Sequence, residues 1–552
     1  MKIVDYIAKY LRDIGIEHIF GYQGGGISPL IEAISNTDGL HYVQLYQEQG
    51  AGFAADAYGR ISQKLGVCLV TNGPGVTNLI SSMANAQFDF SPCLFFTGQV
   101  NVPDINTVDG VRQNGFQEVE TGKIVENITK YFVSIRNKND IKYELGKAIS
   151  IAMKSPKGAV VVELPLDIQK ADIDEEYLEE FIAHDKKENT LDFSSVIGEL
   201  NESKRPLLLV GGGVRTSLGA DELLRELVDF AKLPVVCSLQ GLDIYTENNY
   251  GFTGLYGSIY ANMALYNADL IIGLGCRFSK RQIGIFNKYS KNARYIQVDE
   301  NEKELSRVVP AINYKCEISL FLQSVLELIR KGNHTFDFKK WNEELSGLKI
   351  QYDNHIELNQ NPVQPVVFVR NLSEYIEPAA SIILDVGQNQ MWCAQGLRLK
   401  EGQRVITSAG LGCMGFSLPA SIGAYFAKGT RTFAFMGDGG FQMNMQELNF
   451  IGTNKIPIKI FVFNNNSLGM IQEVQMKFQN QHYIGTKIGY NAPNLHKLAE
   501  AYSIDYHLIS ENEIDDAIKD KIASDVPVLF EISIKDNPSR LLNKYDVLDL
   551  YG

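Results

Sequence analysis

The sequence predicts an α/β protein with three doubly wound parallel-sheet domains. Short apolar runs alternate with helical patterns along the whole chain, an order that is typical of βαβ units. The 552 residues are too many for one hydrophobic core, and two polar stretches divide them into three segments of ordinary domain size. We therefore expect domains over residues 1–170, 190–335 and 360–535, followed by an irregular tail over 536–552.

The first segment contains short strands and ends at a proline. Pro165 stops the last of these strands, because proline has no N–H to donate to a neighbouring strand. The stretch that follows, from Asp172 to Asn189, is rich in Glu, Asp and Lys, the composition of a linker. The strands of this segment are expected at 19–21, 67–71, 94–97 and 159–163.

The second and third segments share this architecture, although no repeat of fixed period is present. A helix over 320–330 closes the second segment, and a polar stretch over 331–361 is expected to link it to the third. The strands are expected in the apolar runs that begin at Arg205, Leu233, Leu270 and Arg294, and then at 381–385, 431–436, 458–464 and 528–532.

Composition and charge exclude several classes of protein. The net charge is −13, the isoelectric point is near 5.3 and the basic residues are scattered, so no nucleic-acid partner is expected. No apolar run reaches the roughly 18 residues of a membrane helix, and the N-terminus lacks a signal-peptide pattern. The seven cysteines are dispersed and form no Cys-x-x-Cys pair, which is typical of a reducing cytoplasm. We therefore expect a cytoplasmic globular protein with no membrane partner.

The triplet Gly437-Asp438-Gly439 is the most informative motif of the chain. It follows one expected strand, and the next expected strand ends at Asn464-Asn465. Because parallel sheets bind ligands at the carboxyl ends of their strands, these side chains should lie close together. One carboxylate with neutral oxygens suits Mg²⁺ that shares its coordination with a diphosphate, and the glycines let backbone N–H groups approach phosphate oxygens. The alternative is a tight strand-to-helix turn with Asp438 as the helix N-cap.

A second group of candidate residues lies in the first segment. Glu48 stands just before a helix of small residues, and the glycine-rich turns 21–26 and 71–78 each follow a strand and precede a helix. Two such turns beside one carboxylate at the same sheet edge indicate a flat ligand held against the backbone. Taken alone, Glu48 is explained equally well as a helix cap.

These residues together resemble the thiamine-diphosphate enzymes of the acetohydroxyacid synthase and pyruvate oxidase group. The resemblance covers about residues 1–535 and implies a pyrimidine-binding domain, a central domain of the FAD-binding type and a diphosphate-binding domain, in that order. It is carried by Gly-Tyr-x-Gly-Gly at 21–25, Glu-Gln-Gly-Ala at 48–51, Gly-Pro-Gly-x-Thr-Asn at 73–78, Thr-Gly-Gln-Val at 97–100, Phe-Gln-Glu at 116–118, Gly-Gly-Gly-Val at 211–214, Arg-Phe at 277–278, Val-Gly-Gln-x-Gln-Met-Trp at 386–392, Gly-Leu-Gly-x-Met-Gly at 410–415 and the Gly-Asp-Gly motif with Asn-Asn.

The resemblance also implies a role for each candidate residue. Glu48 would hydrogen-bond the aminopyrimidine of the cofactor, the Gly412 carbonyl would accept from its amino group, and Met414 would hold the cofactor bent. Phe116 and Gln117 would join Glu48 as catalytic residues by lining the substrate pocket. Mg²⁺ would be held by Asp438, Asn465 and Ser467, and the remaining cofactor contacts would come from Tyr22, Gly24, Gly25, Pro74, Asn78, Gly387, Gln388, Asn389, Gly437, Gly439, Gly440, Leu468, Gly469 and Met470.

By the same resemblance the protein would be a carboligase that decarboxylates a 2-oxo acid such as pyruvate and transfers the acyl unit to a carbonyl acceptor. The acceptor would be a second pyruvate or a larger oxo compound such as an oxo-sugar. The alternatives are non-oxidative decarboxylation, which the absence of a His-His pair disfavours, and a flavin-dependent oxidase of the pyruvate oxidase type. A non-catalytic member of the family should lack Glu48 or Asp438, and both are present. The family shares its site between subunits, which implies a homodimer or a homotetramer.

Several positions depart from the synthase pattern. Val474 stands where the synthases have Trp, which enlarges the acceptor pocket, and Asn389 replaces a His beside the diphosphate. Gln23 replaces a Pro in the first glycine turn. The segment 101–114 is several residues longer than in the synthases, either as a pocket rim for a larger acceptor or as a surface insertion. Lys130 matches a lysine that lies near the substrate entrance in the family, and the alternative is a solvated lysine.

The central segment resembles a flavin-binding domain less closely. Ser279-Lys280 replaces the usual Asp-Asp, and Tyr256 replaces a His. Bound FAD would be structural, because carboligation involves no net oxidation or reduction. The positions that match flavin-binding residues are Gly211, Gly212, Gly213, Arg215, Gly254, Arg277, Arg281 and Asp299.

Overall fold

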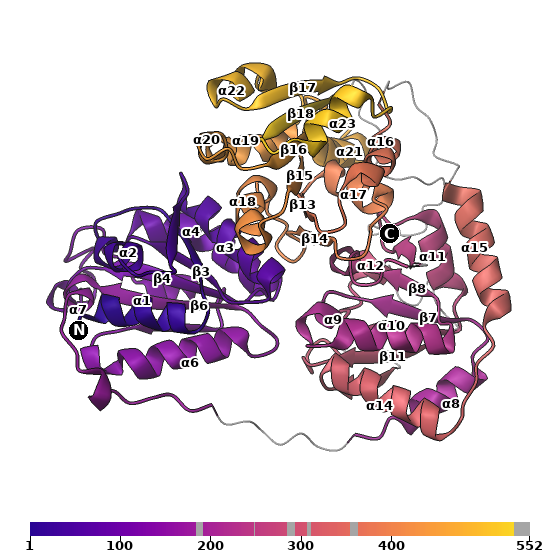
Figure 1. Cartoon of the computed structure of the whole chain (residues 1–552), viewed down its shortest axis with the longest axis horizontal. Coiled ribbons are helices and arrows are strands. Elements are labelled where there is room, and N and C mark those ends of the chain that lie inside the picture. Colours follow the sequence, from indigo (N-terminus) through magenta and orange to yellow (C-terminus); the bar gives the residue numbers. More distant parts are fainter. Residues whose placement is uncertain (184–190, 248, 284–292, 306–310, 354–362, 535–552) are drawn as a thin grey trace.

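The computed structural model describes residues 1–183, 191–247, 249–283, 293–305, 311–353 and 363–534. Figure 1 shows three α/β bodies that follow one another along the chain, coloured from indigo through magenta to yellow. Each body contains one six-stranded sheet within the described ranges, and all of its strand pairs are parallel. The predicted fold class is therefore confirmed. Within these ranges every helix falls short of the length and apolar character that spanning a bilayer requires. The expected tail over 536–552 lies outside the described residues.

The first domain has helices on both faces of its sheet, which explains why its inner strands are apolar at every position. Leu94 and Phe96 of β4 pack with α1, α2 and α6, whereas Phe95 between them packs with α3 and α4 on the opposite face. The strand order is β2-β1-β3-β4-β6-β5. The elements are α1 Ile3–Asp13, β1 His18–Gly21, α2 Ser28–Ser35, β2 His41–Gln44, α3 Glu48–Ser62, β3 Gly66–Val70, α4 Pro74–Phe88, β4 Cys93–Gln99, α5 Thr121–Val125, β5 Tyr131–Ser134, α6 Ile141–Met153, β6 Ala159–Pro165 and α7 Leu166–Gln169.

The third domain has the same strand order relative to the chain, β14-β13-β15-β16-β18-β17. Phe435 of β15 and Phe461 of β16 stack at 4.9 Å on one face, and Ala434 and Met436 face the other. The elements are α16 Pro365–Leu372, β13 Ser381–Leu384, α17 Gln388–Gly396, β14 Arg404–Thr407, α18 Ser417–Lys428, β15 Thr432–Gly437, α19 Asp438–Met443, α20 Leu448–Thr453, β16 Ile458–Asn464, α21 Gly469–Phe478, α22 Leu495–Ala501, β17 Asp505–Ile509, α23 Asp516–Ala523 and β18 Val528–Ser533.

The central domain has the strand order β12-β11-β10-β7-β8-β9. The polar stretch expected as a linker after it contains a helix, α15, that packs on this domain through the buried Trp341 and Leu345. The Trp341 Nε1 donates to the Pro206 carbonyl at 3.0 Å. The elements are α8 Ser194–Glu202, β7 Pro206–Val210, α9 Gly213–Thr216, α10 Ala220–Ala231, β8 Val235–Cys237, β9 Asn249–Phe252, α11 Ile259–Asn267, β10 Leu270–Leu274, α12 Lys280–Ile283, β11 Arg294–Asp299, β12 Ile312–Lys315, α14 Ile318–Lys331 and α15 Lys339–Asp353.

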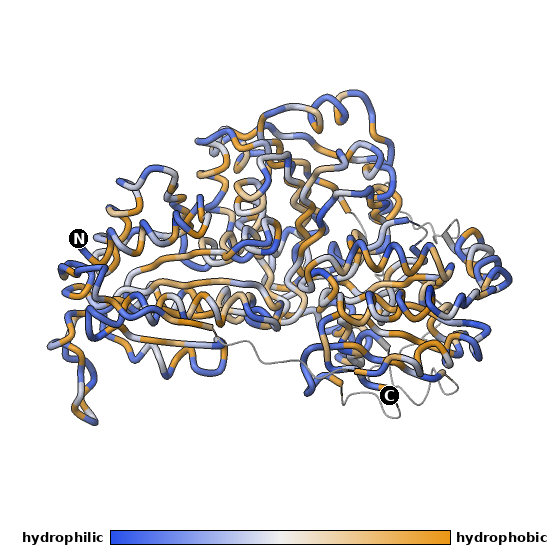
Figure 2. The backbone as a smooth tube through the Cα atoms, turned by 60° about the horizontal axis from the view of Figure 1, so that its bottom comes forward, coloured by the Kyte–Doolittle hydropathy of each residue, from blue (hydrophilic) through white to orange (hydrophobic). Residues whose placement is uncertain are grey.

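The first and third domains share one continuous apolar core. The cluster that includes Phe20 and Leu79 of the first domain extends to Ile422 and Met436 of the third. Helix α3 lies against α18 at this junction, as Figure 1 shows. Figure 2 shows the same organisation along the backbone, with hydrophobic segments inside each body and hydrophilic ones at its periphery. The contact between α3 and α18 therefore fixes the segment before α3, which leads to Glu48, and the segment before α18, which contains Met414.

Candidate functional site

Strand β15 brings Asp438 to the carboxyl end of the third sheet. Asp438 is 1% exposed, and its Oδ1 accepts a hydrogen bond from the Gly439 N–H at 2.9 Å. Its Oδ2 is buried and has no hydrogen-bond partner among the described residues. Burial raises the pKa of Asp438 to about 7, because the charged carboxylate is desolvated, whereas the backbone of Gly439, Ser467 and Asn466 and the Tyr490 hydroxyl oppose the rise. A cation at Oδ2 would pair the orphaned oxygen and stabilise the charge, so this atom fits a Mg²⁺ ligand.

The loop that follows β16 approaches the same edge. Asn465 Nδ2 donates to Gln388 Oε1 at 3.4 Å, and Asn465 Oδ1 accepts from the Ser467 N–H at 3.2 Å. The Leu468 side chain lies against Gly439. Across the described ranges there is no group of three or more His, Cys, Asp or Glu side chains arranged for a metal. A Mg²⁺ site at Asp438 would therefore combine one carboxylate with amide and backbone oxygens.

The glycines beside Asp438 allow a close approach of backbone to side chains. A Cβ on Gly439 would lie 2.4 Å from Leu468 Cδ2, and a Cβ on Gly440 would lie 2.5 Å from Asp385 Oδ1. At Gly440 a larger residue would displace the hydrogen-bonded Asp385 carboxylate, whereas at Gly439 it would require the end of the Leu468 side chain to move. Glycines without side chains at a helix start let backbone N–H groups approach a phosphate, so this turn suits such a ligand.

Asn389 holds the turn that begins α17. Its Nδ2 donates to the carbonyl groups of Asp385 at 2.9 Å and Phe435 at 3.4 Å, and its Oδ1 lies beside Gly387 and Gly437. The side chain is buried. Asn389 thus joins the ends of β13 and β15, the two strands that flank the expected diphosphate position.

The segment after β14 carries Gly412 and Met414. Asp385 holds its far end, because its carboxylate accepts hydrogen bonds from Gly415 N–H at 3.0 Å and Ser417 N–H at 2.8 Å. Burial raises the pKa of Asp385 to about 7, and these backbone donors oppose the rise. Gly412 is exposed, and Met414 Cε lies 3.3 Å from the position that a Cβ on Gly439 would take. Met414 is therefore next to the Asp438 turn.

Glu48 begins α3 in the first domain and is 8% exposed. Its Oε2 accepts a hydrogen bond from Asn78 Nδ2 of α4 at 3.0 Å. The turn before it is tied to the third domain, because the buried Glu447 carboxylate accepts from the Tyr46 N–H at 3.1 and 3.2 Å. Burial raises the pKa of Glu447 to about 7. Glu48 and Asn78 are therefore adjacent. The turn that precedes Glu48 is held against the third domain by Glu447.

The two glycine-rich turns of the first domain meet at its sheet edge. A Cβ on Gly24 would lie 2.5 Å from Thr71 Cβ, and the Gly26 N–H donates to Thr71 Oγ1 at 3.1 Å. Tyr22 and Gly25 lie in the same first turn, whereas Pro74 begins α4 after the second.

Asn72 fixes the Phe116–Gln117 segment beside these turns. Its Nδ2 donates to the carbonyl groups of Phe116 at 3.3 Å and Gln117 at 3.2 Å. Gln117 has a left-handed backbone with φ of 62°, and its carbonyl packs against Gly73. The Phe116 side chain is 85% exposed. The pair predicted to line a pocket is therefore held through its backbone, with Phe116 projecting into solvent in the single chain.

Comparison with known proteins gives the family of this fold and site. Residues 1–124, 194–325 and 385–532 match models of the N-terminal TPP binding domain, the central domain and the C-terminal TPP binding domain of thiamine pyrophosphate enzymes. The acetolactate synthase large subunit of Lactococcus lactis subsp. lactis is 35% identical over 543 residues, covering 96% of this chain and 92% of that protein. The chain belongs to the thiamine pyrophosphate enzyme family.

Further relatives support the same assignment. The probable acetolactate synthase large subunit of Methanocaldococcus jannaschii is 34% identical over 562 residues, covering 97% of this chain and 92% of that protein. The acetolactate synthase of Mycobacterium bovis is 31% identical over 548 residues, covering 96% of this chain and 87% of that protein. The protein is therefore a thiamine pyrophosphate-dependent enzyme that is similar to acetolactate synthase, as its sequence motifs predict.

The central domain of this thiamine pyrophosphate enzyme forms a tight glycine turn after β7. A Cβ on Gly211 would lie 2.1 Å from the Gly275 carbonyl oxygen, and one on Gly213 would lie 2.7 Å from Gly275 Cα. Gly212 lies against Gln240. Such backbone-to-backbone packing at the carboxyl ends of β7 and β10 is compatible with a nucleotide site. The Arg215 guanidinium forms ion pairs with Asp221 at 3.3 Å and Asp243 at 3.6 Å.

The other residues that match flavin-binding positions lie near the same edge. Arg277 follows β10 and is exposed, whereas Asp299 ends β11 and accepts a hydrogen bond from the Asn301 N–H at 2.8 Å. The Arg281 guanidinium lies 5.9 Å from the centre of the Tyr256 ring, and a Cβ on Gly254 would lie 2.7 Å from the Arg281 carbonyl oxygen. The residues present are therefore compatible with a dinucleotide.

The environment of Lys130 fits neither of the two interpretations made from the sequence, a lysine near the substrate entrance or a solvated lysine. Its Nζ donates to the carbonyl groups of Ile151, Lys154 and Pro156 at 2.5–2.7 Å. Burial lowers its pKa to about 8. The ammonium group ends helix α6 by satisfying carbonyls that have no partner within the helix, so Lys130 is neither a solvated lysine nor free to bind substrate.

Three carboxylates at this site were not predicted from the sequence. Asp385 and Glu447 hold backbone segments beside the candidate residues, as described above. Asp89, which follows α4, accepts from the Ala409 and Gly410 N–H groups of the Gly412 segment. For Asp385 a signal does exist, because the residue directly follows an expected strand, as Asp438 does. The backbone N–H groups that donate to Asp89 and Glu447 lie more than 300 residues away, and no local pattern indicates them.

Proposed function

We propose that this enzyme is a Mg²⁺-dependent carboligase that decarboxylates a 2-oxo acid such as pyruvate and transfers the acyl unit to a carbonyl acceptor. One observation carries the proposal: the buried Oδ2 of Asp438 lacks a hydrogen-bond partner among the described residues, beside the Asn465–Ser467 turn. It occurs in a chain that is 31–35% identical to acetolactate synthases over nearly its full length.

Each candidate group has a role that follows from its chemistry. Asp438, Asn465 and the Ser467 carbonyl would hold Mg²⁺, which shares its coordination with the cofactor's diphosphate. The Gly439 backbone would face phosphate oxygens. Glu48, which lies at the start of α3, would hydrogen-bond a ring nitrogen of the pyrimidine and exchange a proton with it. When bound, thiamine diphosphate supplies the electron sink for decarboxylation.

For the acceptor, we propose a second pyruvate or a larger oxo compound such as an oxo-sugar. The segment 101–114, which is longer than in the synthases, is held in a defined conformation by hydrogen bonds. This favours the larger acceptor. The Glu118 carboxylate accepts from the Asn114 N–H at 2.8 Å and the Gly115 N–H at 3.1 Å, and also from the Asn106 N–H. These hydrogen bonds lower its pKa, although burial opposes the effect. A segment closed on one carboxylate is suited to forming a fixed pocket rim.

Product analysis by mass spectrometry tests the reaction. Incubation with pyruvate alone should release CO₂, and acetolactate would identify a second pyruvate as the acceptor. A product that forms only when an oxo-sugar or another carbonyl compound is added would identify the larger acceptor. Acetaldehyde as the main product would instead support a simple decarboxylase, and oxygen consumption would support a flavin oxidase. CO₂ release that is absent under all of these conditions contradicts the proposal.

Variants test the site itself. Glu48→Gln should lower turnover by roughly 10²–10⁴-fold, because the neutral amide cannot exchange a proton. Asp438→Asn should raise the Mg²⁺ concentration needed for activity at least tenfold, because the amide removes the one carboxylate of the proposed metal site. Glu32→Gln is a matched control on the exposed side of α2 and should behave as wild type. Unchanged turnover in Glu48→Gln would contradict the role of that residue.

We further propose structural FAD in the central domain, for which the tight turn at Gly211 and Gly213 is the support. The visible absorption spectrum of the purified protein tests this directly: a spectrum without flavin bands would contradict it. We propose a cytoplasmic location because none of the seven cysteines is joined in a disulfide within the described residues.

We also propose a homodimer or a homotetramer. Five apolar side chains on and after α21 are 48–70% exposed in the single chain, and an interface between subunits would cover them. Analytical ultracentrifugation should give at least twice the chain mass of 61.6 kDa, and a monomer under active conditions would contradict the proposal. These side chains are Ile471, Met476, Phe478, Ile484 and Ile488.

A further inference from the structure

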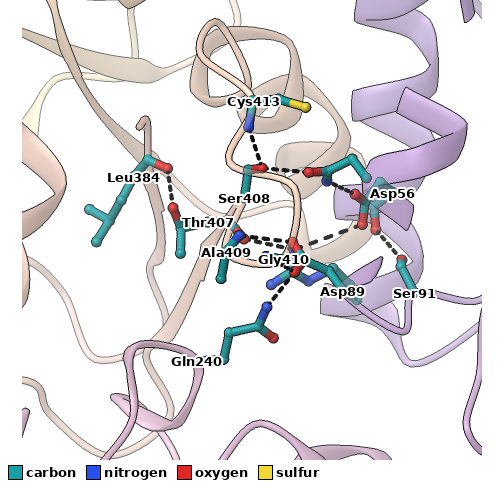
Figure 3. Close-up of polar contacts among 12 residues, drawn as sticks. Asp56, Asp89, Ser91, Gln240, Leu384, Thr407, Ser408, Ala409, Gly410 and Cys413 are labelled. Carbon is teal, nitrogen blue, oxygen red and sulfur yellow. Dashed lines mark hydrogen bonds and ion pairs between the residues drawn. The ribbon is translucent and has the colours of Figure 1, made fainter. Parts of the chain in front are cut away.

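One carboxylate connects all three domains beside the segment that carries Gly412 and Met414. Asp89 is buried; its Oδ1 accepts from the Gly410 N–H at 2.7 Å and its Oδ2 from the Ala409 N–H at 3.1 Å. Gln240 of the central domain donates to the same Oδ1 at 2.6 Å. Figure 3 shows the first-domain helices, the third-domain segment and the central-domain Gln240 around this group.

Arg60 of α3 supplies the positive charge that Asp89 needs. Its Nη1 lies 3.5 Å from Asp89 Oδ2 and donates to the Thr407 carbonyl at 3.0 Å. Burial raises the pKa of Asp89, whereas Arg60, the two backbone donors and Gln240 oppose the rise. Two carboxylate oxygens receive donors from four residues, which an asparagine with one amide oxygen cannot reproduce.

The segment from Ser408 to Ser417 is fixed at its ends and free at its apex. Ser408 Oγ donates to Asn85 of α4 and accepts from the Cys413 N–H at 2.7 Å. Asp385 holds the Ser417 end, as described above. Leu411, at the apex, is 43% exposed, and Gly412 beside it is exposed as well. Among the described residues no strand pairs with this segment, so side chains such as Asp89 and Asp385 accept the hydrogen bonds of its backbone.

We propose that Asp89 is a positioning residue for the reaction: by holding the backbone at Ala409 and Gly410, it sets Gly412 and Met414 against thiamine diphosphate. The inference rests on the proposed function, in which this segment contacts the cofactor. Without the carboxylate, the N–H groups of Ala409 and Gly410, which are only part-buried, lose the acceptor that fixes them, and the apex relaxes away from its bound position. Small displacements of this kind are costly for catalysis, because reacting groups must be held within a fraction of an ångström.

Through Gln240 the central domain takes part in this positioning. The Gln240 Cβ lies 2.9 Å from the position that a Cβ on Gly212 would take, so the residue packs over the glycine turn of that domain. Gln240 also donates a hydrogen bond to Asp89 of the first domain. Asp89 in turn accepts hydrogen bonds from Ala409 and Gly410 of the third domain. A central domain without direct cofactor contacts would thus still affect cofactor affinity.

The test compares Asp89→Asn and Gln240→Leu with the surface control Asp229→Asn, using the full-length protein with saturating Mg²⁺. Quenching of tryptophan fluorescence measures the Kd of thiamine diphosphate, because Trp392 lies buried in α17 directly after the Gly387 turn. Thermal unfolding without the cofactor measures the fold, and CO₂ release from pyruvate at saturating cofactor measures kcat.

For Asp89→Asn we expect a Kd at least tenfold higher and a kcat at least tenfold lower, in protein that still unfolds cooperatively. A merely structural role would lower the melting temperature but leave both constants within twofold of wild type, and that result would overturn the inference. If Asp89→Asn does not fold, Gln240→Leu tests the inference instead. We expect its Kd for thiamine diphosphate to rise three- to tenfold, and an unchanged Kd would overturn the inference. If wild type itself takes up no thiamine diphosphate, the proposed function fails as well.

Discussion

Gly423 offers a direct test of how closely the first and third domains must pack. It lies in α18 against α3, where a Cβ would come 1.9 Å from the Ala54 carbonyl oxygen and 2.7 Å from the Ala54 carbonyl carbon. Carbon and carbonyl oxygen atoms need about 3.3 Å, so Gly423→Ala requires the two helices to separate by roughly 1 Å or more. Both clashing groups are backbone, and no side-chain rotation can relieve them.

The expected cost follows from this overlap. Inserting a methyl group into a well-packed interior costs about 1–3 kcal/mol, and the rigid backbone on the α3 side points to the upper part of that range. Alanine gains about 1 kcal/mol over glycine in helix propensity, which offsets part of the loss. We expect a net destabilisation of about 1–2 kcal/mol, or a fall in melting temperature of roughly 2–8 °C at 2–4 °C per kcal/mol.

The effect should extend to the cofactor, because α18 follows the Met414 segment and α3 begins at Glu48. Differential scanning fluorimetry measures the melting temperature, and fluorescence titration measures the Kd of thiamine diphosphate, which should rise at least threefold. Gly198→Ala is the matched control: this glycine lies in helix α8 with open space around its Cβ position, so the same change should be neutral or stabilising by up to about 1 kcal/mol. A Gly423→Ala protein with wild-type melting temperature and affinity would refute the reasoning.

Two further predictions concern buried charged groups. Because burial raises the pKa of Glu447 from its usual 4.5 to about 7, the folded state prefers the protonated carboxyl, and the free energy of unfolding should fall by about 3 kcal/mol as the pH rises from 4.5 to 7. Glu447→Gln should flatten this dependence in urea unfolding series, and equal slopes in both proteins would contradict the assignment. Lys459→Met should cost about 2–4 kcal/mol, because the Nζ donates to the Ser524 carbonyl, the Ser524 hydroxyl and the Val526 carbonyl. Urea unfolding measures this cost, and a loss below 1 kcal/mol would show that water replaces the ammonium group.

The sequence predicts the inner strands of the three sheets and none of their edges. Each expected run coincides with an inner strand of a described sheet, and the strands without an expected run are the two edges of each sheet. The reason is burial on both faces: β16 is buried at all positions but its last, whereas only Val43 of β2 is buried. Edge strands therefore lack the continuous apolar run by which the inner strands were identified.

Lys459 shows the limit of such patterns even inside a strand. It occupies the second position of β16, within an apolar run, and is fully buried. Composition alone predicts exposure for a lysine, because a buried ammonium group is costly without partners. Its three acceptors come from the loop between α23 and β18, which is distant in sequence. The acceptors that allow Lys459 to be buried are therefore visible only in the tertiary structure.

The sequence likewise predicts some parts of the candidate site and not others. Asp438 and Asn465 could be brought together from the sequence, because consecutive parallel strands end at one edge. The position of Gly412 could not, since its segment depends on Asp89 in another domain, 321 residues from Gly410. Motifs identify residues that are expected to contact a ligand, whereas the groups that hold their backbone are scattered along the chain.

Three buried carboxylates, Asp89, Asp385 and Glu447, share one feature: each accepts hydrogen bonds from backbone N–H groups of an irregular segment next to a candidate residue. Water would satisfy these N–H groups if the segments were exposed, but then the site would be neither fixed nor dry. Burying a carboxylate is costly, and it is tolerated only when donors surround it. The same donors would lose their partner if the domains separated, which leaves unpaired polar groups on both sides. The arrangement of the domains and the shape of the site therefore depend on the same contacts, and a change that loosens one should loosen the other.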